Sequence, residues 1–480
     1  MKKKLRSLLR IVFGRTAFML LFIMLQLAFF FGIVHWISSE YSLISYAGLH
    51  LLGTLTCIYI YNKPENPSFK LSWIIPVLAF PVFGTLLYLY VELEISGRII
   101  SKRANRLVKE SRIYLQQDQK VLSHLEDEDD RLSGLANYVG EFGGFPVYEN
   151  YTAEYFPSGE QKFERLKEEL EKARKFIFME YFIVEHGVMW DTILEILERK
   201  AKEGVEVRFM YDGMCSIALL PYHYPKILEA KGIHCHAFAP IKPALSTYQN
   251  NRDHRKIVVI DGHTAFTGGV NLADEYINVK ERFGYWKDVA VMIKGEAVKN
   301  FTIMFLQMWN IWEKTPLDYE KYLSHDLPQQ IEGRRSEGFV LPYGDSPLDH
   351  EPVGKMVYLD ILNTAKKYVH IMTPYLILDD ETINALRYAA KRGVDVKIIM
   401  PDIPDKKYAF LLAHTYYLEL MDAGVQIYQF RPGFVHAKVF TSDNTKAVVG
   451  SINMDYRSLH LHFECAVYLF RNPAVQQVNC

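Results

Sequence analysis

The motif that decides the fold occurs twice, as RDHRKIVVIDGHTAFTGGVNLADEY at residues 252–276 and as GFVHAKVFTSDNTKAVVGSINMDYRS at residues 433–458. Each copy reads H-x-K-x4-D, followed at equal distances by a glycine and an asparagine. The copies align without a gap at a constant offset of 182 residues. The shared residues are His254 and His436, Lys256 and Lys438, Asp261 and Asp443, Gly268 and Gly450, and Asn271 and Asn453. Identities in one fixed register exclude coincidence, so the chain contains an internal duplication.

The sequence around the motif is duplicated as well. KARKFIFMEYFI at residues 172–183 is echoed at 363–377, and AKEGVEVRFMYD at 201–212 is echoed by AKRGVDVKIIMPD at 390–402. Strand patterns alternate with amphipathic helix patterns, which is typical of an α/β fold. A spacing of about 190 residues indicates two whole lobes, because solenoid repeats are only 20–50 residues long. We predict pseudo-symmetric lobes at 151–335 and 336–480, with the functional site between them.

The end of the second lobe is expected to be shorter than that of the first. Ala297 and Val298 open the helix that closes the first lobe, and they align with Ala474 and Val475. The sequence stops at Cys480. We therefore expect the second lobe to lack its last helix.

The first 92 residues have the composition of a membrane anchor. Residues 16–39, 41–62 and 71–91 carry no Asp, Glu, Lys or Arg, and about 20 apolar residues suffice to cross a bilayer. Pro76 and Pro81 mark the third run as a re-entrant or broken helix. We predict two or three transmembrane or re-entrant helices in residues 1–92 of a multi-pass membrane protein, then a charged linker at 93–150. Basic clusters on both sides of the runs leave the topology open.

Composition excludes several classes of function. The 480 residues hold 55 Lys and Arg against 56 Asp and Glu, which is not the basic balance of a nucleic-acid-binding protein. The five cysteines are scattered and never spaced as C-x-x-C, so neither a disulfide framework nor a zinc cluster is indicated. We expect no metal, no cofactor and no nucleic-acid partner.

The residue types of the motif suit chemistry on a phosphate. His254 and Lys256 alternate along a strand and so share a face. Lysine and asparagine can bind phosphate oxygens, and histidine supplies a nucleophile or a proton carrier near neutral pH. With two copies face to face, one histidine can attack phosphorus while the other protonates the leaving group. The expected phosphate-binding residues are Asn271, Asn453, Gly269 and Ser451, beside the catalytic lysines Lys256 and Lys438.

Two pairs of acidic residues are ambiguous on sequence alone. Asp261 and Asp443 complete the motif and are candidate catalytic residues, but an aspartate at a strand end is also a common turn former. Asp288 and Glu464 lie on corresponding strands and are candidates for orienting the imidazoles, although surface ion pairing is an alternative for either.

The paired motifs resemble those of the phospholipase D superfamily, and the likeness extends from about residue 151 onward. With NPSFKLSWIIPVLAFPVFGTLLYLYVE at residues 66–92, the chain is similar to bacterial cardiolipin synthases. The resemblance implies two phospholipase D-like lobes, each a mixed β-sheet flanked by helices, behind a transmembrane region of the bacterial cell membrane. It also implies that two phosphatidylglycerol molecules give cardiolipin and glycerol through a phosphatidyl-histidine intermediate. His254 and His436 then become nucleophile and general acid/base, in an order that stays open.

One departure from the family pattern falls next to an expected site residue. The family usually reads L-N-x-E after the second motif, whereas this chain has Leu461, His462, Phe463 and Glu464. The motifs alone also leave open a hydrolase that releases phosphatidic acid, because both reactions share their first half. A catalytically inactive membrane scaffold is a third reading, suggested by the short second lobe.

Overall fold

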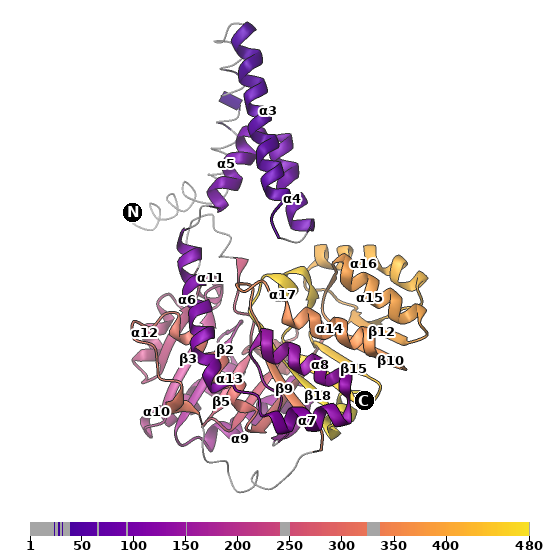
Figure 1. Ribbon diagram of the computed structural model, residues 1–480. Helices are drawn as coiled ribbons and strands as arrows, with labels where there is room; N and C mark the ends of the chain where they lie inside the picture. The colour runs from indigo at the N-terminus through magenta and orange to yellow at the C-terminus, as the bar shows by residue number, and fades with distance from the viewer. Residues whose placement is uncertain are drawn as a thin grey trace. The chain divides into compact units, whose positions relative to one another are not determined.

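The computed structural model describes residues 39–64, 67–92, 95–149, 151–240, 250–323 and 337–479, together with Met24, Leu27, Ala28 and Phe31 (Figure 1). The chain forms two compact units. The N-terminal unit comprises Met1–Ile100 and Ile241–Asn250, and the main unit comprises Ser101–Pro240 and Asn251–Cys480.

The N-terminal unit is helical in its described part. Its helices are α3 Ser39–Tyr61, α4 Pro67–Ala79 and α5 Pro81–Glu92, and Ile60, Val77 and Tyr88 form a small buried cluster among them. The third apolar run is broken, since α4 ends at Ala79 and α5 begins at Pro81, which cannot continue the hydrogen bonding of the preceding helix. None of the described helices has both the length and the apolar character that crossing a membrane requires. The first apolar run, at 16–39, lies almost wholly outside the described residues, so the multi-pass anchor stays a prediction.

The segment expected to be a charged linker is folded. It forms α6 Ile95–Ser111, a 3₁₀ turn at Arg112–Tyr114, α7 Gln119–Glu128, α8 Asp130–Tyr138 and a π-helical turn at Val139–Gly143. Leu107, Leu125 and Leu135 are buried, so these amphipathic helices use their charged faces for solvent and their apolar faces for packing. From Ser101 on, the segment belongs to the main unit.

The first lobe contains a seven-stranded mixed sheet in the order β1-β8-β6-β5-β2-β3-β4. Strands β2, β3 and β4 are parallel and the other neighbours are antiparallel. The strands are β1 Tyr151–Phe156, β2 Phe176–Tyr181, β3 Glu206–Asp212, β4 His234–Phe238, β5 Ile257–Ile260, β6 Thr264–Gly268 and β8 Ala290–Gly295. Every residue of β2 is buried, as expected for a central strand covered on both faces. The helices α9 Gly159–Glu171, α10 Val188–Lys202 and α13 Val298–Asn310 flank this sheet.

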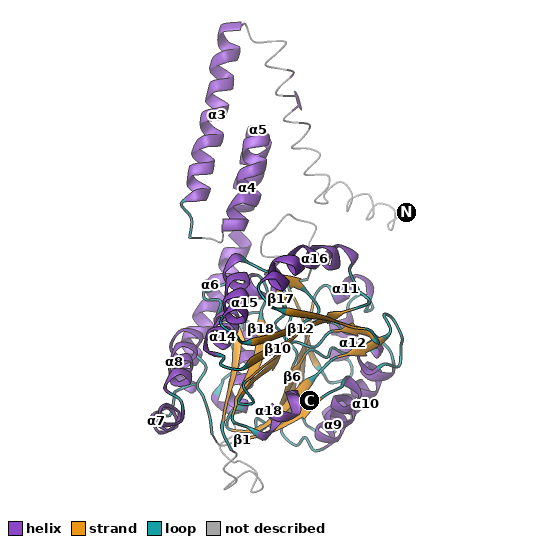
Figure 2. Ribbon diagram, turned by 90° about the vertical axis from the view of Figure 1, so that its right-hand side faces the viewer, coloured by secondary structure: helices purple, strands orange, loops and turns teal. Residues whose placement is uncertain are grey.

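The second lobe repeats this topology. Its sheet has the order β13-β12-β10-β15-β16-β18-β9, with β10, β12 and β13 parallel. Figure 2 labels β10, β12 and β18 of this sheet. The strands are β9 Phe339–Asp345, β10 Tyr368–Met372, β12 Asp395–Pro401, β13 Gln426–Phe430, β15 Val439–Ser442, β16 Lys446–Gly450 and β18 Glu464–Phe470. Its helices include α14 Val353–Thr364, α15 Asp380–Lys391 and α16 Lys407–Asp422. The predicted pair of mixed-sheet α/β lobes is therefore confirmed.

The helix after the last strand differs in length between the lobes. In the described residues α18 spans Pro473–Asn479, whereas α13 spans Val298–Asn310. Ala474 and Val475 of α18 are buried, so this short helix does cover part of the lobe.

The two lobes are joined at the motifs themselves. Strand β14, Gly433–Val435, pairs in parallel with β7, Tyr285–Lys287, of the other lobe. The amide of His436 donates to the carbonyl of Lys287 at 2.7 Å, and that of His254 donates to the carbonyl of Phe463 at 3.0 Å. Each histidine is thus fixed by the backbone of the opposite lobe.

Close approach at this junction requires a glycine at position 433. A Cβ atom there would lie 2.4 Å from both the backbone N and O of Tyr285. We predict that Gly433→Ala separates β14 from β7 and lowers the free energy of unfolding by about 1–3 kcal/mol. Thermal unfolding of the full chain measures this.

Gly134→Ala is the matched control, because no atom lies within 4 Å of a Cβ placed in that helix. Alanine at this position should leave stability unchanged or raise it slightly. Equal melting temperatures for the two variants would show that the strand pairing tolerates a methyl group.

Candidate active site

The histidines of both motifs line one cavity of about 480 Å³. His254 comes directly after the inter-lobe bridge at Asp253, and His436 directly follows β14. They are 6 % and 8 % exposed, so each ring is held inside the protein while still reaching the cavity. The duplication therefore brings together two residues that are 182 positions apart in the chain.

Each imidazole is bonded to a carboxylate of the opposite lobe. His254 Nδ1 lies 2.9 and 3.0 Å from the two carboxylate oxygens of Glu464, and His436 Nδ1 lies 2.7 Å from Asp288 Oδ2. Asp288 and Glu464 are completely buried, so they do not act as surface ion-pair partners. With Nδ1–H donated to a carboxylate, Nε2 is the nitrogen left with a lone pair for chemistry.

The cavity keeps these groups in a defined charge state. Burial, then Lys438, lowers the pKa of His436 to about 4, and Asp288 only partly opposes this. Burial also lowers the pKa of His254 well below its usual value. Burial by itself raises the pKa of Glu464, but His254 and His462 together outweigh it and the net pKa is lowered. At neutral pH the arrangement is therefore two neutral imidazoles, each beside an ionised carboxylate.

The two lysines are buried next to their histidines. Lys256 Nζ donates to the carbonyl of His254, and Lys438 Nζ donates to the carbonyl of His436. Burial lowers the pKa of Lys256 to about 8 and that of Lys438 to about 7. Neither lysine is part of the cavity wall, and an anion beside their amines would favour the protonated form, so their binding of phosphate stays a prediction.

The asparagines of the motif form part of the cavity wall. Asn271 Oδ1 accepts from the amide of Ile183 at 3.0 Å, and its Nδ2 donates to the hydroxyl of Tyr276 at 2.8 Å. Asn453 Nδ2 donates to Ser458 Oγ at 3.1 Å. Each amide nitrogen has a second hydrogen, so donation to a phosphate oxygen remains compatible with these bonds.

Gly269 and Ser451 lie next to the orienting carboxylates, and their expected role as phosphate ligands stays a prediction. A Cβ at position 269 would be 2.0 Å from Asp288 Oδ1, so only glycine leaves room for that side chain. Ser451 Oγ donates to Glu464 Oε2 and accepts from the amide of Cys465 at 3.1 Å. Gly269 thus leaves room for Asp288, and Ser451 holds Glu464. Like Lys256 and Lys438, neither residue is part of the cavity wall.

Asp261 and Asp443, whose catalytic or turn-forming role the sequence leaves open, bind backbone amides in the structure. Each carboxylate accepts three backbone N–H groups that open a neighbouring strand, at 2.7–2.9 Å for Asp261 and 2.7–3.0 Å for Asp443. The donors are Arg174, Lys175 and Phe176 for Asp261, and Lys366, Lys367 and Tyr368 for Asp443. Strand β5, Ile257–Ile260, lies between His254 and Asp261 in the chain. A left-handed φ of 53° and 55° at the two aspartates marks both as turn residues.

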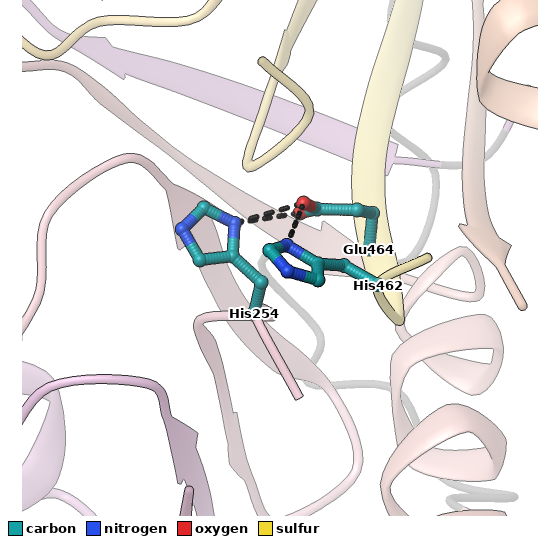
Figure 3. A group of neighbouring side chains, drawn as sticks. All are labelled: His254, His462 and Glu464. Atoms are coloured by element: carbon teal, nitrogen blue, oxygen red, sulfur yellow. Dashed lines mark hydrogen bonds and ion pairs between the residues drawn. The ribbon is translucent and has the colours of Figure 1, made fainter. Parts of the chain in front are cut away.

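His462 is part of the site, although the sequence indicated it only as a departure from the L-N-x-E pattern of the family. Its Nδ1 lies 3.6 Å from Glu464 Oε1, so two histidine rings share one carboxylate (Figure 3). Arg457 Nε donates to His462 Nε2 at 3.2 Å. Since an arginine always donates, Nε2 must accept, and the ring proton sits on Nδ1, facing Glu464.

The same group, His254, His462 and Glu464, has the residue types of a metal site, with ligand atoms within 4.8 Å of one another. A metal ion would need the lone pair of a ring nitrogen on His462. Nε2 is already used to accept from Arg457, and a metal at Nδ1 would move the ring proton onto Nε2, opposite the arginine N–H. The donor set therefore fits a hydrogen-bonded cluster better than a metal ion.

Aromatic rings that the sequence pattern did not single out pack around the histidines. The ring of Phe182 lies 4.8 Å from that of His254, and the rings of Tyr276 and Trp286 lie 5.3 and 5.5 Å from that of His436. These contacts fix the imidazole planes and exclude water from around them. Tyr276 is the last residue of the motif stretch at residues 252–276, but no spacing rule connects it with His436.

Two facing H-x-K copies on duplicated mixed-sheet lobes define a protein of the phospholipase D class. A family described as "Cardiolipin synthase, PLD-like domain" matches residues 166–309 and 358–480, and one described as "Phospholipase_D-nuclease N-terminal" matches 51–91. The chain belongs to the cardiolipin synthase family.

Relatives of similar length support this membership. A protein of Streptococcus mutans is 52 % identical over 88 % of this chain and 90 % of its own. The cardiolipin synthase of Alkalihalophilus pseudofirmus is 34 % identical over 90 % of this chain and 86 % of its own. The crystal structure of phosphatidylserine synthase from Haemophilus influenzae shares the fold, with a TM-score of 0.54 and 15 % identity over 73 % of this chain and 88 % of that one.

The scaffold assignment of Asp261 predicts a loss of stability without a matching loss of chemistry. Asp261→Ala leaves three backbone N–H groups without their acceptor and should cost at least about 2 kcal/mol of unfolding free energy. The protein that remains folded should keep kcat/KM within about tenfold of the parent. In the same assay, the kcat/KM of Asp288→Ala should fall by at least about a hundredfold. Equal activity losses in the two variants would contradict the assignment.

The position of His462 predicts a shift in the pH profile. Burial, then Lys256, and to a smaller extent His462, lower the pKa of His254, whereas Glu464 raises it. His462→Phe removes one lowering influence, so the pKa of His254 rises and its neutral form is lost at a higher pH. The acid limb of kcat/KM should therefore move to higher pH, as a steady-state profile would show. His462→Asn removes the same charge and should shift the limb in the same direction, and an unchanged limb in both variants would remove the role.

Proposed function

We propose that this chain is a cardiolipin synthase, a phosphatidyltransferase that acts on two phosphatidylglycerol molecules and releases glycerol. The observation that carries the proposal is the pair of buried histidines in one cavity, each bonded through Nδ1 to a carboxylate of the other lobe. Its family membership agrees with this chemistry.

In the first half-reaction, Nε2 of one histidine attacks the phosphorus of phosphatidylglycerol. A P–N bond forms and the P–O bond to the glycerol headgroup breaks. The second imidazole takes up a proton at Nε2 when the phosphate anion binds, and it gives that proton to the leaving oxygen. Glu464 and Asp288 stabilise whichever imidazole carries positive charge at each step. Lys256 and Lys438, with Asn271 and Asn453, hold the non-bridging phosphate oxygens.

In the second half-reaction, a hydroxyl of another phosphatidylglycerol gives its proton to the second imidazole and attacks phosphorus. The P–N bond breaks, the first histidine is regenerated, and the product is cardiolipin. One phosphoester is exchanged for another and the protons balance, so the reaction requires no nucleotide and no cofactor.

The proposed location is the bacterial cell membrane, with residues 1–92 as a multi-pass anchor. This is supported by the charge-free runs and by the family match at residues 51–91. A lipid substrate with two acyl chains requires an enzyme that works at a bilayer, which is consistent with such an anchor.

The full-length protein, purified in detergent, tests the function when incubated with acyl-labelled phosphatidylglycerol without nucleotide. Cardiolipin and one glycerol per cardiolipin formed are the expected products. Phosphatidic acid with glycerol would instead identify a hydrolase that uses water as acceptor, and folded protein without any product would favour an inactive scaffold.

The two-histidine mechanism predicts that His436→Ala loses at least about a thousandfold in turnover while its melting temperature stays close to that of the parent. The backbone bond from residue 436 to Lys287 is kept in this variant, so the lobe junction should survive. Lipid product analysis and thermal unfolding check both parts. Turnover like that of the parent in folded His436→Ala would remove the mechanism.

A further inference from the structure

Helix α16, Lys407–Asp422, lies on the outside of the second lobe (Figure 1). It exposes apolar side chains that the packing of the main unit does not use. Tyr408, Leu411 and Leu418 are 71 %, 68 % and 74 % exposed, and Leu412 and Met421 are exposed as well. Positions 408, 411, 412 and 418 lie on one face of the helix, because residues three, four and seven apart share a face. This face is apolar in the first turns and also carries the exposed acids Glu419 and Asp422 near its end. The opposite side, with Ala409, Ala413 and Leu420, is buried against the lobe.

The helix begins at the rim of the histidine cavity. Lys406 and Tyr408 belong to the cavity wall together with His254 and His436. Lys406 Nζ donates to the hydroxyl of Tyr375 at 2.8 Å, and that hydroxyl donates to Asp405 Oδ2 at 2.7 Å. The exposed apolar stripe therefore leads away from the cavity mouth along α16.

The charges at the start of α16 have no role in helix stability. Lys406 is the N-cap residue and Lys407 the first helical residue, a helix end at which positive charge is unfavourable. A helix that lies on an anionic bilayer surface, however, presents lysines beside apolar and aromatic side chains. The start of α16 presents two exposed lysines beside leucines and a tyrosine.

We infer that the apolar stripe of α16 inserts into the surface of an anionic lipid bilayer and delivers the lipid headgroup to the histidine cavity. The inference rests on the proposed function, since a substrate with two acyl chains must keep them in apolar surroundings while its phosphate reaches His254 and His436. Leu411, Leu412 and Leu418 supply those surroundings next to the mouth, and Lys406 and Lys407 attract the anionic headgroups.

The test compares one substrate in a bilayer with its soluble analogue. The full chain is reconstituted into phosphatidylcholine vesicles and assayed either with long-chain phosphatidylglycerol in the bilayer or with dihexanoyl phosphatidylglycerol dissolved in the buffer. The variant Leu411→Glu/Leu418→Glu should turn over the bilayer substrate about tenfold or more slowly than the parent. Its rate on the soluble substrate should fall by less than about twofold. Neither leucine is part of the cavity wall.

The matched control places two glutamates at other exposed apolar positions of the main unit, Ile113→Glu/Val188→Glu, which are 65 % and 53 % exposed in the parent. Its rates on both substrates should stay at the parent level. Equal losses on both substrates in the α16 variant would mean that the stripe packs against protein, either a second copy or the N-terminal unit. No loss on either substrate would mean that the stripe makes no contact that matters for turnover. Equal losses on both substrates, or no loss on either, would each overturn the inference.

A second measurement does not depend on turnover. A tryptophan introduced as Leu411→Trp should be quenched by lipids brominated on their acyl chains beyond the quenching of the six native tryptophans, whereas Ile113→Trp should not. Absence of cardiolipin from the parent together with quenching at position 411 would refute the proposed function and leave the membrane contact in place. Absence of extra quenching at position 411 overturns the contact itself.

Discussion

The exchange of hydrogen bonds between the lobes at the two motifs is the interaction on which the site depends. Each histidine receives its backbone partner from the other lobe, through Phe463 for His254 and Lys287 for His436. Each imidazole also receives its carboxylate from the other lobe. Neither lobe can assemble a working imidazole alone, so the pairing of β14 with β7 positions the backbone and the reactive groups in one step.

The buried charges follow from this arrangement. A carboxylate without a partner would be neutralised by burial, but Asp288 and Glu464 have their pKa values lowered because histidines and lysines surround them. The imidazoles stay neutral because burial and the neighbouring ammonium groups outweigh the carboxylates. Catalysis therefore depends on a balance between four charged groups that only the assembled junction provides.

Much of the fold could be predicted from the sequence, because the duplication is written in a gapless register and strand patterns alternate with helix patterns around it. The same register located the two histidines and their lysines. It does not give the roles of Gly269, Ser451, Asp261 and Asp443, since a linear motif does not say which members face the cavity and which hold the turn or the carboxylate next to it. The crossing of Asp288 to His436 and of Glu464 to His254 is a property of the lobe junction, and His462 became meaningful only when Arg457 fixed its tautomer.

The central claim is that one of these two histidines carries the phosphatidyl group. The most direct test is to mix the full chain with phosphatidylglycerol, quench within the first turnover, and locate any added mass on peptides by mass spectrometry. The account predicts a phosphatidyl adduct on His254 or His436, and its disappearance when more phosphatidylglycerol is allowed to react. Cardiolipin formation at the parent rate with no adduct on either histidine would contradict it.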